Sequence, residues 1–171
     1  MKKPLLELQM TIELPLKAGG TFDWKVLDLA ALIQYYASNS DIYRTFLRHA
    51  VSNYTLPFNA IIHEDEVTPG NMIMMRRKVH GWYFSIEEFG PYIRCEAAWI
   101  QFASLQSDFV SSKVLGGFSC VVSALHRALV FQTQVFTAGI AVDIGGENRL
   151  SLTLAVTTHV SWSGASLTVL T

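Results

Sequence analysis

Charge is what this 171-residue sequence has least of: Lys and Arg number 13 and Asp and Glu 14, so 16% of the residues are charged. An average globular protein has about 25%. Hydrophobic residues make up 50% and the mean hydropathy is +0.28, which excludes a disordered chain. The net charge of -1 excludes a global field that would draw the chain to nucleic acid or an anionic membrane. Because so few charges cannot coat an ordinary monomer, we expect part of the apolar surface to meet a partner.

Cysteines and long apolar runs are also scarce. Cys95 and Cys120 are the only two cysteines, and we interpret them as reduced core thiols rather than a disulfide. No stretch reaches the roughly 18 consecutive apolar residues of a membrane span. Glu7 and Glu13 interrupt the apolar N-terminus, which excludes a secretory signal. These features predict an intracellular chain, soluble or peripheral to a membrane.

Motifs of catalysis and cofactor binding are missing. The glycine pairs at 19–20, 116–117 and 145–146 lie outside any nucleotide-binding loop pattern, so we interpret them as turns. Residues 63–66 (HEDE) are metal-ligand types, but consecutive strand residues face opposite sides, so we interpret them as a solvated acidic loop. The flanks of the cysteines (IRCEA and FSCVV) indicate core positions rather than a thiol nucleophile. We therefore expect no enzyme, no cofactor and no metal.

What is present begins with a strand and two helices. Residues 6–16 alternate apolar and polar side chains, which predicts a half-buried strand. Thr21 is placed to cap a helix whose apolar stripe is Phe22, Val26, Leu29, Ile33 and Tyr36. The polar residues 38–41 end it and cap a second helix, which Pro57 terminates. Its expected apolar side comprises Ile42, Phe46, Leu47, Ala50, Val51 and Tyr54.

Strand patterns dominate the rest. We predict strands over 58–67, 72–87 and 92–102, a polar loop over 107–112, and an apolar helix over about 118–130 capped by Ser119. A hairpin over 133–144 and 149–162 and a flexible tail over 163–171 follow. The whole predicts one α+β domain over 1–171, with a mainly antiparallel sheet packed against a helical pair (21–54) and the later apolar helix.

A basic stretch, Arg76, Arg77 and Lys78, lies beside Trp82 and Tyr83. Basic side chains next to aromatic ones suit phosphates and stacked bases, or anionic lipid headgroups. The alternative is a charged solvent-facing side of a sheet. Further cations extend the patch if they fold onto the same side: Lys2, Lys3, Lys17, Arg44 and Arg48.

The C-terminal part is poor in charge. After Trp99 the charged residues are Asp108, Lys113, Arg127, Asp143, Glu147 and Arg149. We expect this part to form core and a contact surface. The candidates for self-association lie near its end: Trp162, Leu167, Val169 and Leu170.

The opening unit resembles the globular core of rhabdovirus matrix proteins, especially the smaller plant-infecting ones. The likeness rests on a first strand around Met10–Ile12, an aromatic-led helix over 22–36, and the break Asp41-Ile42-Tyr43 that leads into Phe46-Leu47. The basic strand over 76–84 resembles the one that follows in that family. The resemblance extends over roughly residues 5–135 and implies a non-enzymatic structural protein.

Such a protein self-associates, condenses the ribonucleocapsid, lines the inner face of the envelope and drives budding. The implied partners are further copies, the viral nucleoprotein or ribonucleocapsid, and an anionic membrane surface, with no specific nucleic-acid sequence. The implied location is the virion and the host cytoplasm.

Two other interpretations remain open. One is a small α+β ligand-binding module or enzyme with an apolar pocket lined by Trp82, Phe84 and Trp99. His80 or Glu96 would supply its polar groups. The other is an assembly subunit of non-viral origin, cellular or phage, that shares the association signal.

Overall fold

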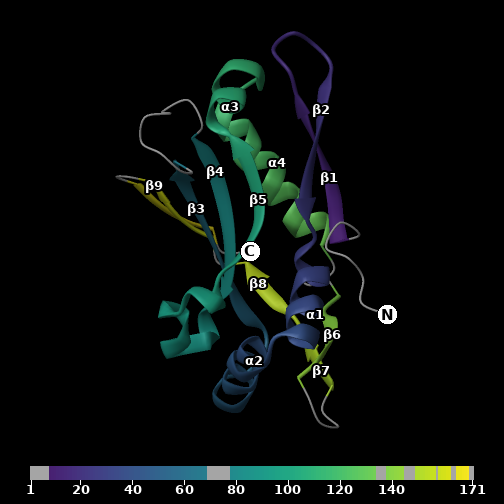
Figure 1. Ribbon diagram of the computed structural model, residues 1–171, viewed down its shortest axis with the longest axis vertical. Coiled ribbons are helices and arrows are strands. Elements are labelled where there is room, and N and C mark those ends of the chain that lie inside the picture. The colour runs from purple at the N-terminus through teal and green to yellow at the C-terminus, as the bar shows by residue number, and fades with distance from the viewer. Residues whose placement is uncertain are drawn as a thin grey trace.

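The structure is a computed structural model, which describes residues 8–68, 78–133, 138–144, 149–156, 158–162 and 165–169. It confirms the α+β class: antiparallel sheets pack against helices (Figure 1). In Figure 1 the N-terminal hairpin and helix α1 (Leu29–Asn39) lie on the right of the molecule. Most of a four-stranded sheet lies on the left, and helix α4 (Gly117–Gln132) lies between them.

The chain opens with the hairpin of β1 (Gln9–Pro15) and β2 (Thr21–Leu27), paired antiparallel from Gln9↔Leu27 to Pro15↔Thr21. The first strand is confirmed. The helix predicted to begin at Thr21 is wrong over Thr21–Leu27, where Trp24 and Val26 are buried and alternate with exposed neighbours. Gly19 and Gly20 have φ values of 89° and 79°, which glycine adopts without strain, and they turn the chain.

The helical pair begins later than predicted. Helix α1 runs Leu29–Asn39, and the Asp28 carboxylate caps it by accepting from the Ala31 N–H at 2.8 Å. The polar break is confirmed, because Ser40 caps α2 (Asp41–Asn53) by accepting from the Tyr43 N–H at 3.2 Å. Tyr43 lies in the core, whereas Ile42, expected there, is exposed.

The main sheet has the order β5-β4-β3-β8. Strands β3 (Phe58–Val67), β4 (Val79–Ile86) and β5 (Ile100–Gln106) are antiparallel, and β8 (Leu154–Val156) runs parallel to β3. One face of β4 is buried as predicted, with Trp82, Phe84 and Ile86 in the core. The acidic run 63–66 belongs to β3 instead of forming a loop.

Between β4 and β5 the prediction of a strand from residue 92 is wrong. The chain forms the 3₁₀ helices η3 (Glu87–Arg94) and η4 (Glu96–Ala98). The chain kinks inside η3 at Gly90, which has a φ of 58°, and Pro91 follows. Trp99 holds the end of the segment by donating its Nε1–H to the Ile93 carbonyl at 2.8 Å. The Phe89-Gly90-Pro91 sequence predicts a turn, and the kink lies there, but the alternation of residues 92–99 does not reveal the 3₁₀ helices.

Two helices follow β5. The expected polar loop is wrong, because α3 spans Ser107–Lys113. The apolar helix is confirmed as α4 (Gly117–Gln132), with Val121, Leu125, Ala128 and Leu129 buried, but Gly116 in the left-handed region precedes it and Ser119 lies inside it.

The described C-terminal part is built of short strands. The predicted hairpin is confirmed only in its inner part, where β6 (Ile140–Asp143) pairs with β7 (Arg149–Leu152). The second strand, predicted over 149–162, is divided, and its later residues pair with other strands. Beyond β8, strands β9 (Thr158–Trp162) and β10 (Ala165–Val169) pair antiparallel, so the described residues of the expected tail form a strand.

The hairpin is held against the main sheet by tryptophans. The rings of Trp24 on β2 and Trp82 on β4 lie edge to face at 5.2 Å, and Trp24 Nε1–H donates to the Ser104 carbonyl at 2.9 Å. Helix α4 packs beside β1, so the core lies between the hairpin, α4 and the sheet.

Candidate functional site

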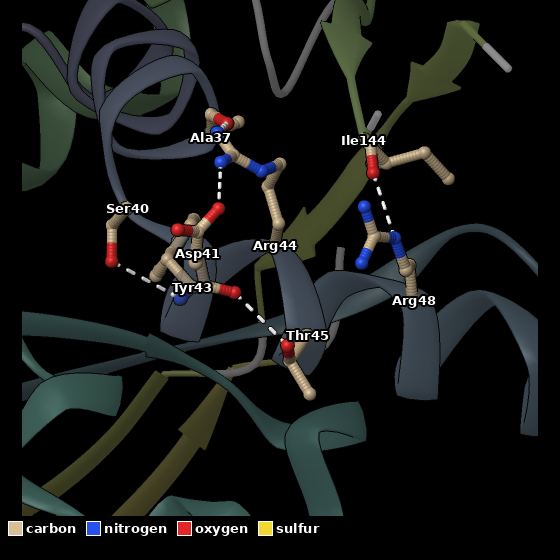
Figure 2. A network of polar contacts seen from close by, with 8 residues as sticks. All are labelled: Ala37, Ser40, Asp41, Tyr43, Arg44, Thr45, Arg48 and Ile144. Carbon is tan, nitrogen blue, oxygen red and sulfur yellow. Dashed lines mark hydrogen bonds and ion pairs between the residues drawn. The ribbon is translucent and has the colours of Figure 1, made fainter. Parts of the chain in front are cut away.

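The side chains of both arginines of α2 form hydrogen bonds with other residues of this chain (Figure 2). Arg44 Nη1–H donates to the Ala37 carbonyl at 2.8 Å, and its Nη2 pairs with Asp41. That carbonyl belongs to the last turn of α1, where helical partners are lacking. Arg48 Nε–H donates to the Ile144 carbonyl at 2.8 Å and ties α2 to the segment after β6. Arg44 and Arg48 therefore join elements, although both were expected to contact an anionic partner.

Lys78 is also paired. Its Nζ lies 2.9 Å from Glu66 Oε2, and this hydrogen bond lowers the pKa of that carboxyl below its ordinary value. Lys78 lies beside the far end of β3 from α2, about 30 Å away for a ten-residue strand. The described residues thus do not bring Lys78 together with Arg44 and Arg48.

Other predicted contact residues fall outside what the structure describes. Lys2, Lys3, Arg76, Arg77 and Leu170 lie outside the described residues. The backbones of Trp162, Leu167 and Val169 lie in β9 and β10, while their side chains are not described. Self-association through these side chains stays a prediction.

The two histidines of β3 and β4 have different partners. His80 Nδ1 lies 2.7 Å from Glu64 Oε1, and the His80 ring packs on Phe118 with centroids 4.7 Å apart. His63 packs on Trp99 instead. Within the described ranges no group of three or more His, Cys, Asp or Glu side chains is arranged to hold a metal ion.

Two further ionisable groups are held inside the fold. The Glu88 carboxylate accepts from the Asn59 N–H at 2.8 Å and anchors η3 to β3, and burial raises its pKa. Burial lowers the pKa of His126 on α4.

Two of the three residues expected to line an apolar pocket lie in the core. Trp82 and Phe84 are 2% and 0% exposed and pack in the core. A groove of about 700 Å³ lies elsewhere, between β1 and α4. Thr11 and Glu13 line it from the strand, and Cys120, Ala124, Arg127 and Ala128 line it from the helix.

Sequence reasoning missed this groove, because its two walls are more than 100 positions apart in the chain. One signal for it was visible. Cys120, Ala124 and Ala128 recur at every fourth position of a helix, which gives α4 a stripe of small side chains. Such a stripe lets another backbone come close, but it does not say which one.

The chain was compared with protein-family models, curated proteins and solved structures, and it matches none of them. Among the described helices none is long and apolar enough to cross a membrane. The site must therefore be interpreted from its own geometry.

Proposed function

We propose that this chain is a non-enzymatic structural protein of the viral matrix type, which associates with further copies of itself. It would do so on the inner face of an envelope, next to the ribonucleocapsid. The observation that carries the proposal is the exposure of large apolar side chains at the start of α2 and on the segment that leaves it.

Three of the five large apolar side chains that are exposed among the described residues belong to this region. They are Ile42 (57% exposed), Tyr54 (46%) and Leu56 (41%). Tyr54 and Leu56 alternate on the segment between α2 and β3, where residues 52–57 are all exposed. The arginines of the same helix direct donors to backbone carbonyls, so part of the local charge is already satisfied.

Burial of such side chains favours association. Removing one large apolar side chain from water contributes about 1.5–3 kcal/mol. Isolated apolar side chains are common on monomers, so the low charge of the chain matters as well. With 16% charged residues, this chain has few side chains to keep copies apart.

The membrane and nucleocapsid parts of the proposal rest on the resemblance over residues 5–135 and on the basic stretch at 76–78. Basic clusters attract anionic headgroups and ribonucleoprotein alike. Liposomes containing phosphatidylserine, with neutral liposomes as the control, test the membrane part directly.

Light scattering across concentration tests self-association. We expect the apparent mass of the purified chain to rise with concentration. In the double variant Tyr54→Ser/Leu56→Ser the midpoint should move to at least tenfold higher concentration. Because both side chains are exposed, the free energy of unfolding should change by no more than about 0.5 kcal/mol.

Phe131→Ser is the matched control, because Phe131 is 76% exposed on a different helix. If Phe131→Ser weakens association and the double variant does not, the surface on α2 is wrong. A chain that stays monomeric at every concentration contradicts the proposed function itself.

A further inference from the structure

One edge of β1 is directed away from β2. Within the hairpin the Leu16 N–H donates to the Gly20 carbonyl at 3.0 Å, and the Asp28 N–H donates to the Leu8 carbonyl at 2.7 Å. The even-numbered residues of this strand therefore face β2. Successive residues of a strand direct their backbone groups to opposite edges, so Thr11 and Glu13 direct theirs outward.

The chain itself begins a third strand on this outer edge. The Leu115 N–H donates to the Pro15 carbonyl and the Lys17 N–H donates to the Lys113 carbonyl, both at 2.8 Å. These bonds form an antiparallel bridge between Leu16 and Val114. Gly116, at φ 79°, then turns the chain away into α4.

Beyond that bridge the edge stays open within the part of the chain that the structure describes. The backbone N–H and C=O groups of Thr11 and Glu13 face away from β2. Outside the β1–β2 pairing, neither residue makes a backbone hydrogen bond to the described part of the chain. Their two N–H and two C=O groups face the groove. An open row of this kind is a template for an added strand.

Helix α4 forms the opposite wall and suits a polypeptide backbone. Cys120, Ala124 and Ala128 are small, so a strand can lie close to the helix surface. The volume of about 700 Å³ is within the usual range of roughly 300–1,000 Å³ for a binding pocket. Arg127 is exposed on this wall, has no ion pair among the described side chains, and is the one Lys, Arg, Asp or Glu of α4.

We propose that this groove binds an extended, acidic peptide segment of a partner protein, which adds to β1 as an antiparallel third strand. The alternating donors and acceptors of Thr11 and Glu13 require an extended backbone as their complement. The bridge at Leu16 and Val114 shows that this edge already pairs with an antiparallel segment, which favours the same direction for an added strand. The Arg127 guanidinium selects a carboxylate on the α4 side of the groove, away from the Glu13 carboxylate on the β1 side. Apart from the carboxylate that Arg127 selects, the side chains that face α4 are small and aliphatic.

Selection from phage-displayed random heptapeptides tests the proposal. We expect enriched sequences with alternating small aliphatic residues and an Asp or Glu. The best peptide is then synthesised and its affinity measured by fluorescence anisotropy. N-methylation at alternate positions should abolish binding at one parity and spare it at the other. Absence of enrichment, or equal tolerance of both parities, overturns the proposal.

Variants of the protein locate the site. Thr11→Pro removes an outward N–H and keeps the bonds of β1 to β2, so binding should fall at least tenfold. Thr11→Val is its control, because it removes the hydroxyl that accepts from Lys25 and keeps the N–H. Should Thr11→Pro fail to fold, Ser123→Trp fills the groove from α4, and Ser119→Trp is the matched control outside it.

Charge reversal tests the chemistry of the occupant. Selection against Arg127→Glu should enrich Lys or Arg in place of Asp or Glu. Unchanged acidic preference overturns the assignment of Arg127. If no peptide binds and the wild-type chain forms a dimer that Thr11→Pro abolishes, the groove holds a second copy, and the partner-peptide proposal is wrong. Association that Tyr54→Ser/Leu56→Ser weakens and Thr11→Pro leaves intact belongs to the α2 surface instead.

Discussion

Helices α2 and α4 use their arginines in opposite ways. On α2, Arg44 and Arg48 donate to backbone carbonyls of other elements, while Tyr54 and Leu56 remain exposed beside the helix. On α4, the exposed residue Arg127 lies at an open strand edge. Whether an arginine contributes to folding or to binding therefore depends on the partner of its guanidinium.

The largest expected difference between the helices concerns stability. Arg44→Met keeps the aliphatic stem but leaves the Ala37 carbonyl without its donor, which should lower the free energy of unfolding by about 1–3 kcal/mol. Arg127→Met should change it by no more than about 0.5 kcal/mol. Urea unfolding followed by circular dichroism measures both variants. Equal losses of unfolding free energy in the two variants would contradict the proposed difference between α2 and α4.

Arg48→Met should lower the stability less than Arg44→Met does. Arg48 is exposed, and within the described ranges its side chain makes one hydrogen bond, to the Ile144 carbonyl, so its loss should cost about 0.5–1.5 kcal/mol. Hydrogen exchange should quicken at β6 and β7, which this bond ties to α2. If exchange there stays unchanged while the stability falls, the bond does not hold the hairpin.

His126 gives the smallest effect, and it belongs to α4. Burial holds its pKa below the ordinary 6.5, so the folded state binds the proton less readily than the unfolded state. The contribution to stability is therefore present above about pH 6.5 and is lost as pH falls. Urea midpoints between pH 7 and pH 5 should decline, and His126→Gln should decline less. An identical decline in the two proteins would show that other groups cause it.

Much of the fold was predictable because its patterns are local. The alternation of β1, the polar break at Ser40 and the helical spacing of Val121, Leu125 and Leu129 all proved right. Strand β2 was missed because Phe22 and Val26 fit a helical spacing of four as well as alternation. The deciding signal was the short turn at Gly19, which favours a hairpin over a helix start.

The sites were much harder to predict than the elements. Sequence marks Arg44 and Arg48 as cations, but their acceptors lie on other elements. The groove needs β1 and α4 to meet, and the open edge follows from the backbone register of the hairpin, which was missed together with β2. Tertiary placement, rather than local propensity, creates both surfaces.

The most direct test of the central claim is sedimentation velocity across protein concentration at low and high salt. Apolar contacts of Tyr54 and Leu56 predict oligomers that grow with concentration and strengthen between 0.05 M and 0.5 M salt, roughly, because salt screens charge and not apolar burial. Association that weakens as salt rises, or a monomer at every concentration, would contradict the claim.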